Sequence, residues 1–204
     1  VEQSEGEQHV GPGEGAGAWP AARDGDRFAY RRLYAALFAE TLLACQELEV
    51  PVHVHAGITG GPWGGPINEA DPFLLASLLS QPAYRASKIV LLHAGYPWIE
   101  QASMMAHAFP QVWVDIGWVT PWTSLRAIEC MRAFLASAPL SRLMIGTGGH
   151  GTPEIAWLGA KVAKIALGTV LDEAVGNGLM PGASAARVAA MILYDNAAQL
   201  YGAS

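Results

Sequence analysis

Two short segments of this sequence each bring a histidine to the end of a strand-like pattern. In Pro51–Gly57 (PVHVHAG), valines alternate with His53 and His55, which is the period of a strand whose alternate side chains share one face. The segment Ile89–Gly95 (IVLLHAG) carries His93 and ends in the same His-Ala-Gly tripeptide. Imidazole is a common metal ligand and carries protons near neutral pH. We therefore predict that His55 and His93 belong to one functional site.

The role of His53 stays open at this stage. It lies one pleat before His55 and therefore deeper in the sheet. It could line the substrate site and support the neighbouring ligand from behind, or it could be a core histidine. A lone histidine at a strand end is more often a hydrogen-bonded structural residue. The repeated tripeptide is what favours a functional role for His55 and His93.

Other polar and aromatic side chains also follow strand-like segments. Asp115 ends one such segment and His150 follows another, so both would reach the same edge of a parallel sheet as the histidines. Imidazole and carboxylate groups are zinc ligands, and a bound metal lowers the pKa of water to about 7. Asp115 could instead accept hydrogen bonds from loop amides. Tyr96 and Trp118 lie just past strand ends, where they would line a substrate pocket or pack in the core.

The elements that must position these residues alternate between strand and helix, which predicts an α/β fold with a parallel sheet. Four βα units are visible, and four strands cannot close an eight-stranded barrel. A smaller open layer is possible, but we favour the C-terminal part of a (β/α)8 TIM-type barrel, with residues 1–27 as a linker or disordered segment and 28–204 as the partial barrel. The predicted strands fall within residues 51–57, 89–93, 112–116 and 143–146, and the predicted helices within residues 28–49, 72–79, 98–108, 121–137, 153–175, 184–193 and 196–201.

Composition narrows the classes of function. The 204 residues are 51% hydrophobic and 15% charged with a net charge of −6, which argues against nucleic acid or an anionic membrane as a partner. No apolar run approaches the roughly 18 residues of a membrane span, and no secretory signal is visible. Cys45 and Cys130 lie in apolar helical patterns, which is typical of reduced thiols in a cytoplasmic protein. We expect a small-molecule substrate, and either a homo-oligomer or an N-terminal half that is missing from this chain.

Four segments carry a family pattern in their order and spacing. They are PVHVHAG, IVLLHAGYPWIEQASMMAHAFPQVWVDIG, LMIGTGGHGTPEIAWLGAK and NAAQLYG, and they extend from about residue 30 to residue 202. The pattern resembles the metal-dependent amidohydrolases of the second amidohydrolase group. It is most similar to the amidohydrolase-like domain that is fused to glutamine-synthetase-like domains in fungal and bacterial proteins. This resemblance implies a (β/α)8 barrel, a divalent metal with zinc as the expected ion, His55 as a metal ligand, and His93 as the catalytic histidine.

The sequence departs from that family pattern at two places. The family sites also use a His-x-His pair on the first barrel strand, and nothing before Phe28 resembles a strand. Gly148 occupies the position of the eighth-strand aspartate, so the metal could be absent. Two functions therefore stay open. One is a metal-dependent hydrolase that cleaves a C–N or related bond, or decarboxylates its substrate, with a metal-activated water. The other is a degenerate, non-catalytic amidohydrolase-like module that binds a ligand or a partner.

Overall fold

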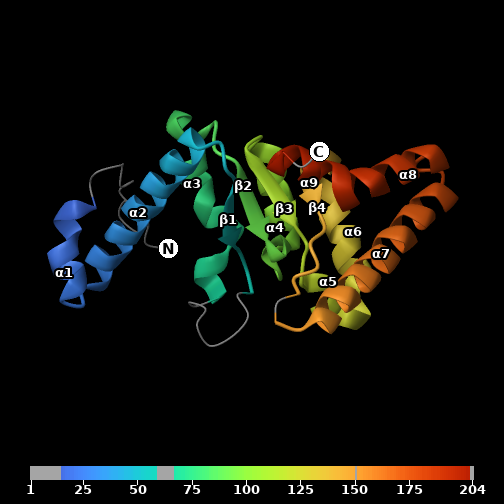
Figure 1. Cartoon of the computed structure of the whole chain (residues 1–204), viewed down its shortest axis with the longest axis horizontal. Helices are drawn as coiled ribbons and strands as arrows, with labels where there is room; N and C mark the ends of the chain where they lie inside the picture. The colour runs from blue at the N-terminus through green and yellow to red at the C-terminus, as the bar shows by residue number, and fades with distance from the viewer. Residues whose placement is uncertain (1–14, 59–66, 150, 203–204) are drawn as a thin grey trace, which may run out of the picture.

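The centre of the computed structural model is a four-stranded parallel sheet (Figure 1). The structure describes residues 15–58, 67–149 and 151–202. Every neighbouring pair of strands in the sheet is parallel, so the predicted α/β fold with four βα units is confirmed. The strands lie side by side in sequence order as β1 (Val52–His55), β2 (Ile89–Leu92), β3 (Val112–Asp115) and β4 (Leu143–Met144).

Strand β4 is shorter than predicted, and the reason lies in its neighbour. Its ladder with β3 joins Val114 to Leu143 and Asp115 to Met144. Two residues later, the backbone N–H of Gly146 donates to the Asp115 side chain at 2.6 Å. Because a side chain accepts this hydrogen bond, the backbone leaves the ladder and the strand ends.

The helices follow the strands as the alternating pattern predicts. Asp26 accepts hydrogen bonds from the N–H groups of Phe28 and Ala29 and caps the first long helix, and Asp71 caps a 3-10 turn, Pro72–Leu75, in the same way. The α-helices of the described chain are α1 (Trp19–Arg23), α2 (Arg27–Glu47), α3 (Ala76–Leu79), α4 (Ile99–Ala108), α5 (Val119–Thr123), α6 (Ala127–Ser137), α7 (Pro153–Gly176), α8 (Gly182–Ala190) and α9 (Asn196–Tyr201).

Three predicted helices differ from the expectation. The predicted helix 72–79 begins as the 3-10 turn Pro72–Leu75 and is α-helical only in α3. The predicted helix 121–137 is interrupted, because Ser124 has a left-handed φ of 45° and starts a separate 3-10 turn between α5 and α6. The predicted helix 184–193 instead changes into a π-helical turn, Met191–Asp195, which leads directly into α9. This turn carries the end of the described chain back to the sheet.

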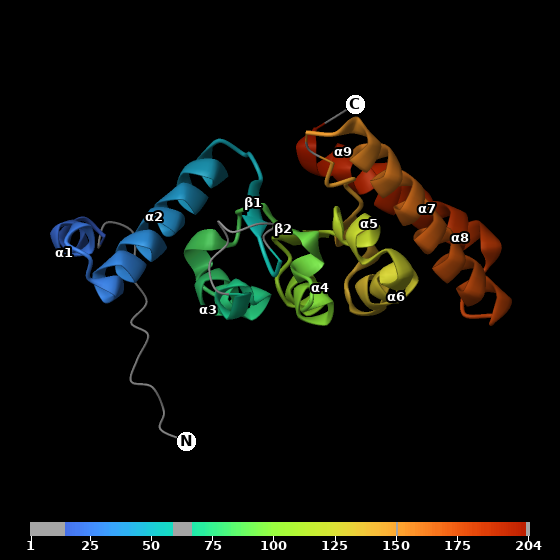
Figure 2. The same ribbon diagram turned by 90° about the horizontal axis from the view of Figure 1, so that it is seen from below.

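The sheet has a covered face and an open face. Figure 2 shows α3, α4 and α6 along one side of the sheet. The side chains of β2, β3 and β4 that point to these helices form the main core and have no exposed surface, whereas Val52 and Val54 of β1 are partly buried. We call this set the covered face: Ile89, Leu91, Val112, Val114 and Leu143. Because side chains alternate along a strand, the opposite set is the open face: His53, His55, Val90, Leu92, Trp113, Asp115 and Met144.

Helix α9 packs on part of the open face. Leu200 forms a small apolar cluster with Val90 and Met144, all nearly inaccessible to solvent. The Asn196 side-chain amide donates to the carbonyl oxygens of Leu140 and Leu143 at 2.8 and 2.7 Å, which anchors α9 beside β4. Strand β1 lies at the other edge of the sheet, and its His53 and His55 are exposed.

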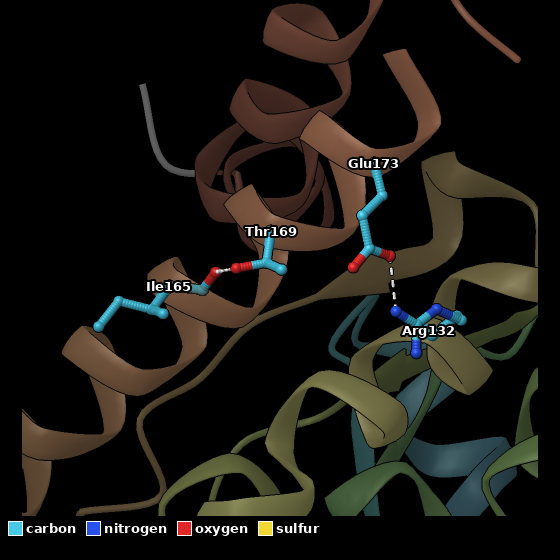
Figure 3. Close-up of polar contacts among 4 residues, drawn as sticks. All are labelled: Arg132, Ile165, Thr169 and Glu173. Atoms are coloured by element: carbon cyan, nitrogen blue, oxygen red, sulfur yellow. Dashed lines mark hydrogen bonds and ion pairs between the residues drawn. The ribbon is translucent and has the colours of Figure 1, made fainter. Parts of the chain in front are cut away.

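An exposed ion pair joins the outer helices α6 and α7 at the surface. Figure 3 shows Arg132 of α6 donating to Glu173 of α7 at 2.6 Å, while Thr169 donates to the carbonyl oxygen of Ile165 within α7 at 2.9 Å. Both partners of the ion pair are about half exposed, so solvent screens the attraction. The buried apolar contacts between α6 and α7 therefore hold these helices together.

The described part of the N-terminal segment contains helical structure that the sequence did not indicate. A 3-10 turn, Ala16–Ala18, leads into α1, which packs against α2. The division of the chain at residues 27 and 28 stays a prediction. Cys45 and Cys130 are both free thiols, and Cys130 is buried. No helix of the described chain has the length and apolarity needed to cross a bilayer.

Candidate active site

The structure brings His55 and His93 together at the carboxyl ends of β1 and β2. His55 is the last residue of β1 and pairs with Leu92, so His93 follows directly beside it. The centres of the two imidazole rings are 5.0 Å apart and their planes are inclined by 51°. The predicted meeting of the two histidines is therefore present in the geometry, whereas their chemical roles stay predictions.

His93 is held in one tautomer by the loop after β3. Its Nδ1 lies 2.9 Å from the carbonyl oxygen of Gly117. A carbonyl can only accept, so Nδ1 carries the proton and Nε2 keeps its lone pair. His93 and Ala94 also have left-handed φ values of 58° and 45°, which are rare for residues with a side chain and are often found at functional sites. The backbone is thus strained where it presents the Nε2 lone pair.

Gly57, the last residue of the first His-Ala-Gly tripeptide, lets the loop after β1 approach the second tripeptide closely. A Cβ atom at Gly57 would overlap the backbone of Gly95 and the carbonyl oxygen of Tyr96. That carbonyl accepts a hydrogen bond from the N–H of Ile58 at 2.7 Å. The loops after β1 and β2 therefore touch backbone to backbone, which keeps the two histidines adjacent.

His55 is held as a neutral imidazole. Partial burial lowers the pKa of His55 below its usual value, and the positive charge that His93 or His53 can carry lowers it further. A neutral imidazole has the lone pair that a metal ligand needs. At neutral pH, His55 is therefore ready to coordinate a metal or to accept a hydrogen bond.

Asp115 accepts hydrogen bonds from the loops after β3 and β4. Its Oδ1 accepts from the N–H of Gly117 at 2.8 Å and from that of Gly146 at 2.6 Å. Burial raises the pKa of the Asp115 carboxyl, while these two amides and the nearby His93 oppose that shift. The alternative prediction, that Asp115 satisfies loop amides, describes the observed contacts, and its predicted substrate contact stays untested.

A row of aromatic side chains borders the histidines. Trp118 meets the ring of His93 edge to face at 5.5 Å and stacks on Trp122 at 5.4 Å with an interplanar angle of 12°. Tyr96 meets Trp122 edge to face at 5.5 Å. Trp122 is half exposed, so the row continues from the histidines to the surface. Tyr96 and Trp118 are thus placed where a substrate could contact them.

His53 has a partner that no local pattern indicated. Its Nε2 lies 2.7 Å from the hydroxyl oxygen of Tyr201, and the two rings meet edge to face at 5.8 Å. Tyr201 belongs to the NAAQLYG segment, which carried only a family resemblance and no site prediction. The contact joins residues 148 positions apart, so only the folded chain reveals it.

The predicted site residue His150 lies outside the described residues.

The sequence profile of the amidohydrolase family matches residues 9–203. The chain belongs to the amidohydrolase family. Protein fluG of Emericella nidulans is 35% identical to this amidohydrolase over 152 residues, which are 74% of this chain and 17% of that protein. The resemblance to the amidohydrolase family that the sequence motifs indicated is therefore confirmed.

Two solved structures share the amidohydrolase fold seen here. A candidate metal-dependent hydrolase from Lactobacillus casei matches with a TM-score of 0.78 and 22% identity over 93% of this chain. Uronate isomerase from Thermotoga maritima matches with a TM-score of 0.65 and 19% identity over 92% of this chain. The amidohydrolase chain spans 49% and 45% of these two proteins. At this identity the likeness concerns the fold, and it agrees with a partial barrel.

Position 148 of this amidohydrolase is adapted to glycine. Gly148 has a left-handed φ of 66°, and a Cβ atom there would overlap the backbone and Cβ of Trp118. An aspartate at this position would therefore require the loop or Trp118 to move. The local structure is therefore packed around a glycine at the position where the family resemblance leads us to expect an aspartate.

The described part of the amidohydrolase chain supplies an incomplete metal site. Within it, no three His, Cys, Asp or Glu side chains lie close enough together to hold a metal ion. A catalytic zinc site uses three protein ligands. His55 and His93 can supply two imidazole nitrogens, so these residues fit part of such a site.

Proposed function

We propose that this amidohydrolase chain contributes to a metal-dependent hydrolase site in which His55 binds a divalent metal and His93 is the catalytic histidine. The observation that carries the proposal is the pair of imidazole rings 5.0 Å apart at the carboxyl ends of adjacent parallel strands. In barrels of parallel strands, catalytic groups occur at this end. The reaction is hydrolysis of a C–N or related bond, with decarboxylation as the variant reaction.

His93 is the proton carrier in this scheme. The carbonyl of Gly117 holds the proton on Nδ1, so Nε2 can accept a proton from an attacking water and later return it to the leaving group. The protonated ring keeps its hydrogen bond to Gly117 throughout. The same bond therefore fixes the direction from which the proton is taken.

The expected metal is zinc, because imidazole nitrogens are among its preferred ligands. His55 would hold it through a neutral imidazole. When bound, the ion supplies the Lewis acidity that lowers the pKa of the attacking water. The remaining ligands would come from residues beyond the described part of the chain.

The substrate is a small molecule that reaches the histidines past the aromatic row. Trp118 and Tyr96 would contact its apolar part, while His53, Asp115 and His150 are the predicted polar contacts. The stacking of Trp118 on Trp122 supports this placement, because it leaves a row of ring edges and faces beside His93.

Further strands would continue the sheet. Among the described strands, β1 pairs with β2 alone and β4 pairs with β3 alone, so both edges can accept another strand. We expect these strands to come from an N-terminal half or from a second copy of the chain.

The two free cysteines support a cytoplasmic location.

Metal analysis of the full-length protein, combined with activity assays on amides, esters, lactones and carboxylates, tests the proposal. His55→Ala should lower the metal content, because it removes a ligand. His93→Ala should lower kcat about 100-fold or more through loss of the proton carrier. His107→Ala is the matched control, because His107 is an exposed histidine on α4. Unchanged metal content and activity in both site variants would refute the proposal.

A non-catalytic module is the second candidate, and the conformation at Gly148 favours it. The loop there has no room for a carboxylate side chain. This candidate predicts that the purified full-length protein contains no stoichiometric metal and turns over no member of the substrate panel. Stoichiometric zinc with turnover would exclude it.

A further inference from the structure

The contact between His53 and Tyr201 links the two edges of the sheet across the open face. His53 belongs to β1, whereas Tyr201 is the last residue of α9, which is anchored beside β4. Their polar atoms lie 2.7 Å apart, within the usual range for a hydrogen bond. Among the described residues, neither side chain makes a second hydrogen bond.

Tyr201 is held in place by contacts that do not involve His53. Asn196 binds two carbonyl oxygens beside β4, and Leu200 packs against Val90 and Met144. Gly202 ends α9 in a left-handed conformation with φ of 68°. The Tyr201 hydroxyl is therefore presented by a helix whose anchoring contacts at Asn196 and Leu200 are separate from His53.

The hydroxyl keeps its proton at neutral pH. Burial raises the pKa of Tyr201, and the negative charge of Asp115 raises it further. A protonated phenol can donate one hydrogen bond. The Nε2 atom of His53 is the acceptor within reach.

We propose that Tyr201 is a positioning residue whose hydroxyl donates to Nε2 of His53 and so holds the proton of the neutral imidazole on Nδ1. In this state both ring nitrogens of His53 are occupied, one by the hydroxyl and one by a proton. His53 then cannot ligate a metal, and it can offer a ligand only the Nδ1–H donor. The functional consequence of this inference rests on the proposed function. It is that His55 is the metal ligand on β1, whereas His53 binds an acceptor group of the substrate, such as a carbonyl or carboxylate oxygen.

Long-range 1H–15N NMR of full-length protein with 15N-labelled histidine tests this directly. Spectra are recorded at about pH 8.5, well above the ordinary histidine pKa of about 6.5, so that imidazoles are neutral. The His53 signals are identified by their loss in His53→Gln. We expect the 15N shifts to place the proton on Nδ1 in the wild type. In Tyr201→Phe, we expect the population to move to the Nε2–H tautomer.

Tyr194→Phe is the matched control, because Tyr194 is an exposed tyrosine in the π-helical turn before α9. It should leave the His53 tautomer unchanged. Unaltered His93 signals would show that the fold around the site survives in Tyr201→Phe. A wild-type proton on Nε2, or the same tautomer with and without the Tyr201 hydroxyl, would overturn the proposal.

Metal content provides a second readout that separates this inference from the proposed function. His53→Gln should retain the wild-type metal content, whereas His55→Ala should lose it. An equal loss in His53→Gln would overturn the inference. A protein that never binds metal would refute the proposed function, while the NMR measurement would still decide the role of Tyr201.

Discussion

The two faces of the sheet are made from alternate residues of the same four strands, yet their side chains are held in different ways. On the covered face, Leu91 and its neighbours are fully enclosed by helices that follow them closely in the chain. On the open face, His53 and His55 are exposed, and His53 takes its partner from the far end of the chain. The comparison teaches that packing on the covered face determines the fold. On the open face, the exposed positions of β1 can vary their chemistry at less cost in stability than the buried part around Val90 and Met144.

A buried substitution gives the largest expected effect and tests the covered face. Leu91→Ala would remove a side chain with no exposed surface and leave a cavity, which should lower the free energy of unfolding by about 2–5 kcal/mol. His55→Ala, on the open face of the neighbouring strand, should cost far less, because His55 is exposed. Urea unfolding monitored by circular dichroism measures both. Equal losses would break the comparison between the faces.

Gly148→Asp should have an intermediate effect. The left-handed φ and the overlap with Trp118 should together lower the stability by about 1–3 kcal/mol. We expect no gain in metal content, because the new carboxylate cannot occupy the space that Trp118 fills. Gly178→Asp is the matched control, since Gly178 has a similar φ of 70° but open space around it. If Gly148→Asp is as stable as this control and binds more metal, the loop is not adapted to glycine.

The smallest effect concerns pH. Because the folded-state pKa of His55 is lowered, the unfolded chain binds the proton at a higher pH than the folded chain does. The stability from this residue is therefore fully present above the ordinary histidine pKa of about 6.5, and it declines as the pH falls toward the lower folded-state value. The decline should be slight, since His55 is exposed and solvent screens its charge. Chemical unfolding of the wild type and His55→Gln between about pH 5 and 8 should show a flatter profile for the variant.

The sequence was most informative where neighbours in the chain decide the structure. Alternating valines indicated β1. The helix caps at Asp26 and Asp71 are equally local, because the N–H groups that donate to these side chains lie two or three residues later in the chain. The meeting of His55 and His93 was also predictable, because parallel strands end at one edge of a sheet. These features follow from periodicity and topology alone.

The sequence was least informative where distant loops share one acceptor. Asp115 binds Gly146, 31 residues away, and Gly117 binds His93, 24 residues away. Tyr201 and its bond to His53 could not be derived from any spacing. Strand β4 ends early because Gly146 donates to Asp115. The predicted end of this strand was therefore wrong for the same reason, since the sequence does not reveal this long-range hydrogen bond.

The bond between His53 and Tyr201 also has a consequence for the order of synthesis. A ribosome makes the chain from its N-terminus, so His53 emerges 148 residues before Tyr201, whose hydroxyl binds it. A nascent chain can form all four βα units while His53 still lacks this partner. The contact between His53 and Tyr201 therefore forms only after α9 has docked on the sheet.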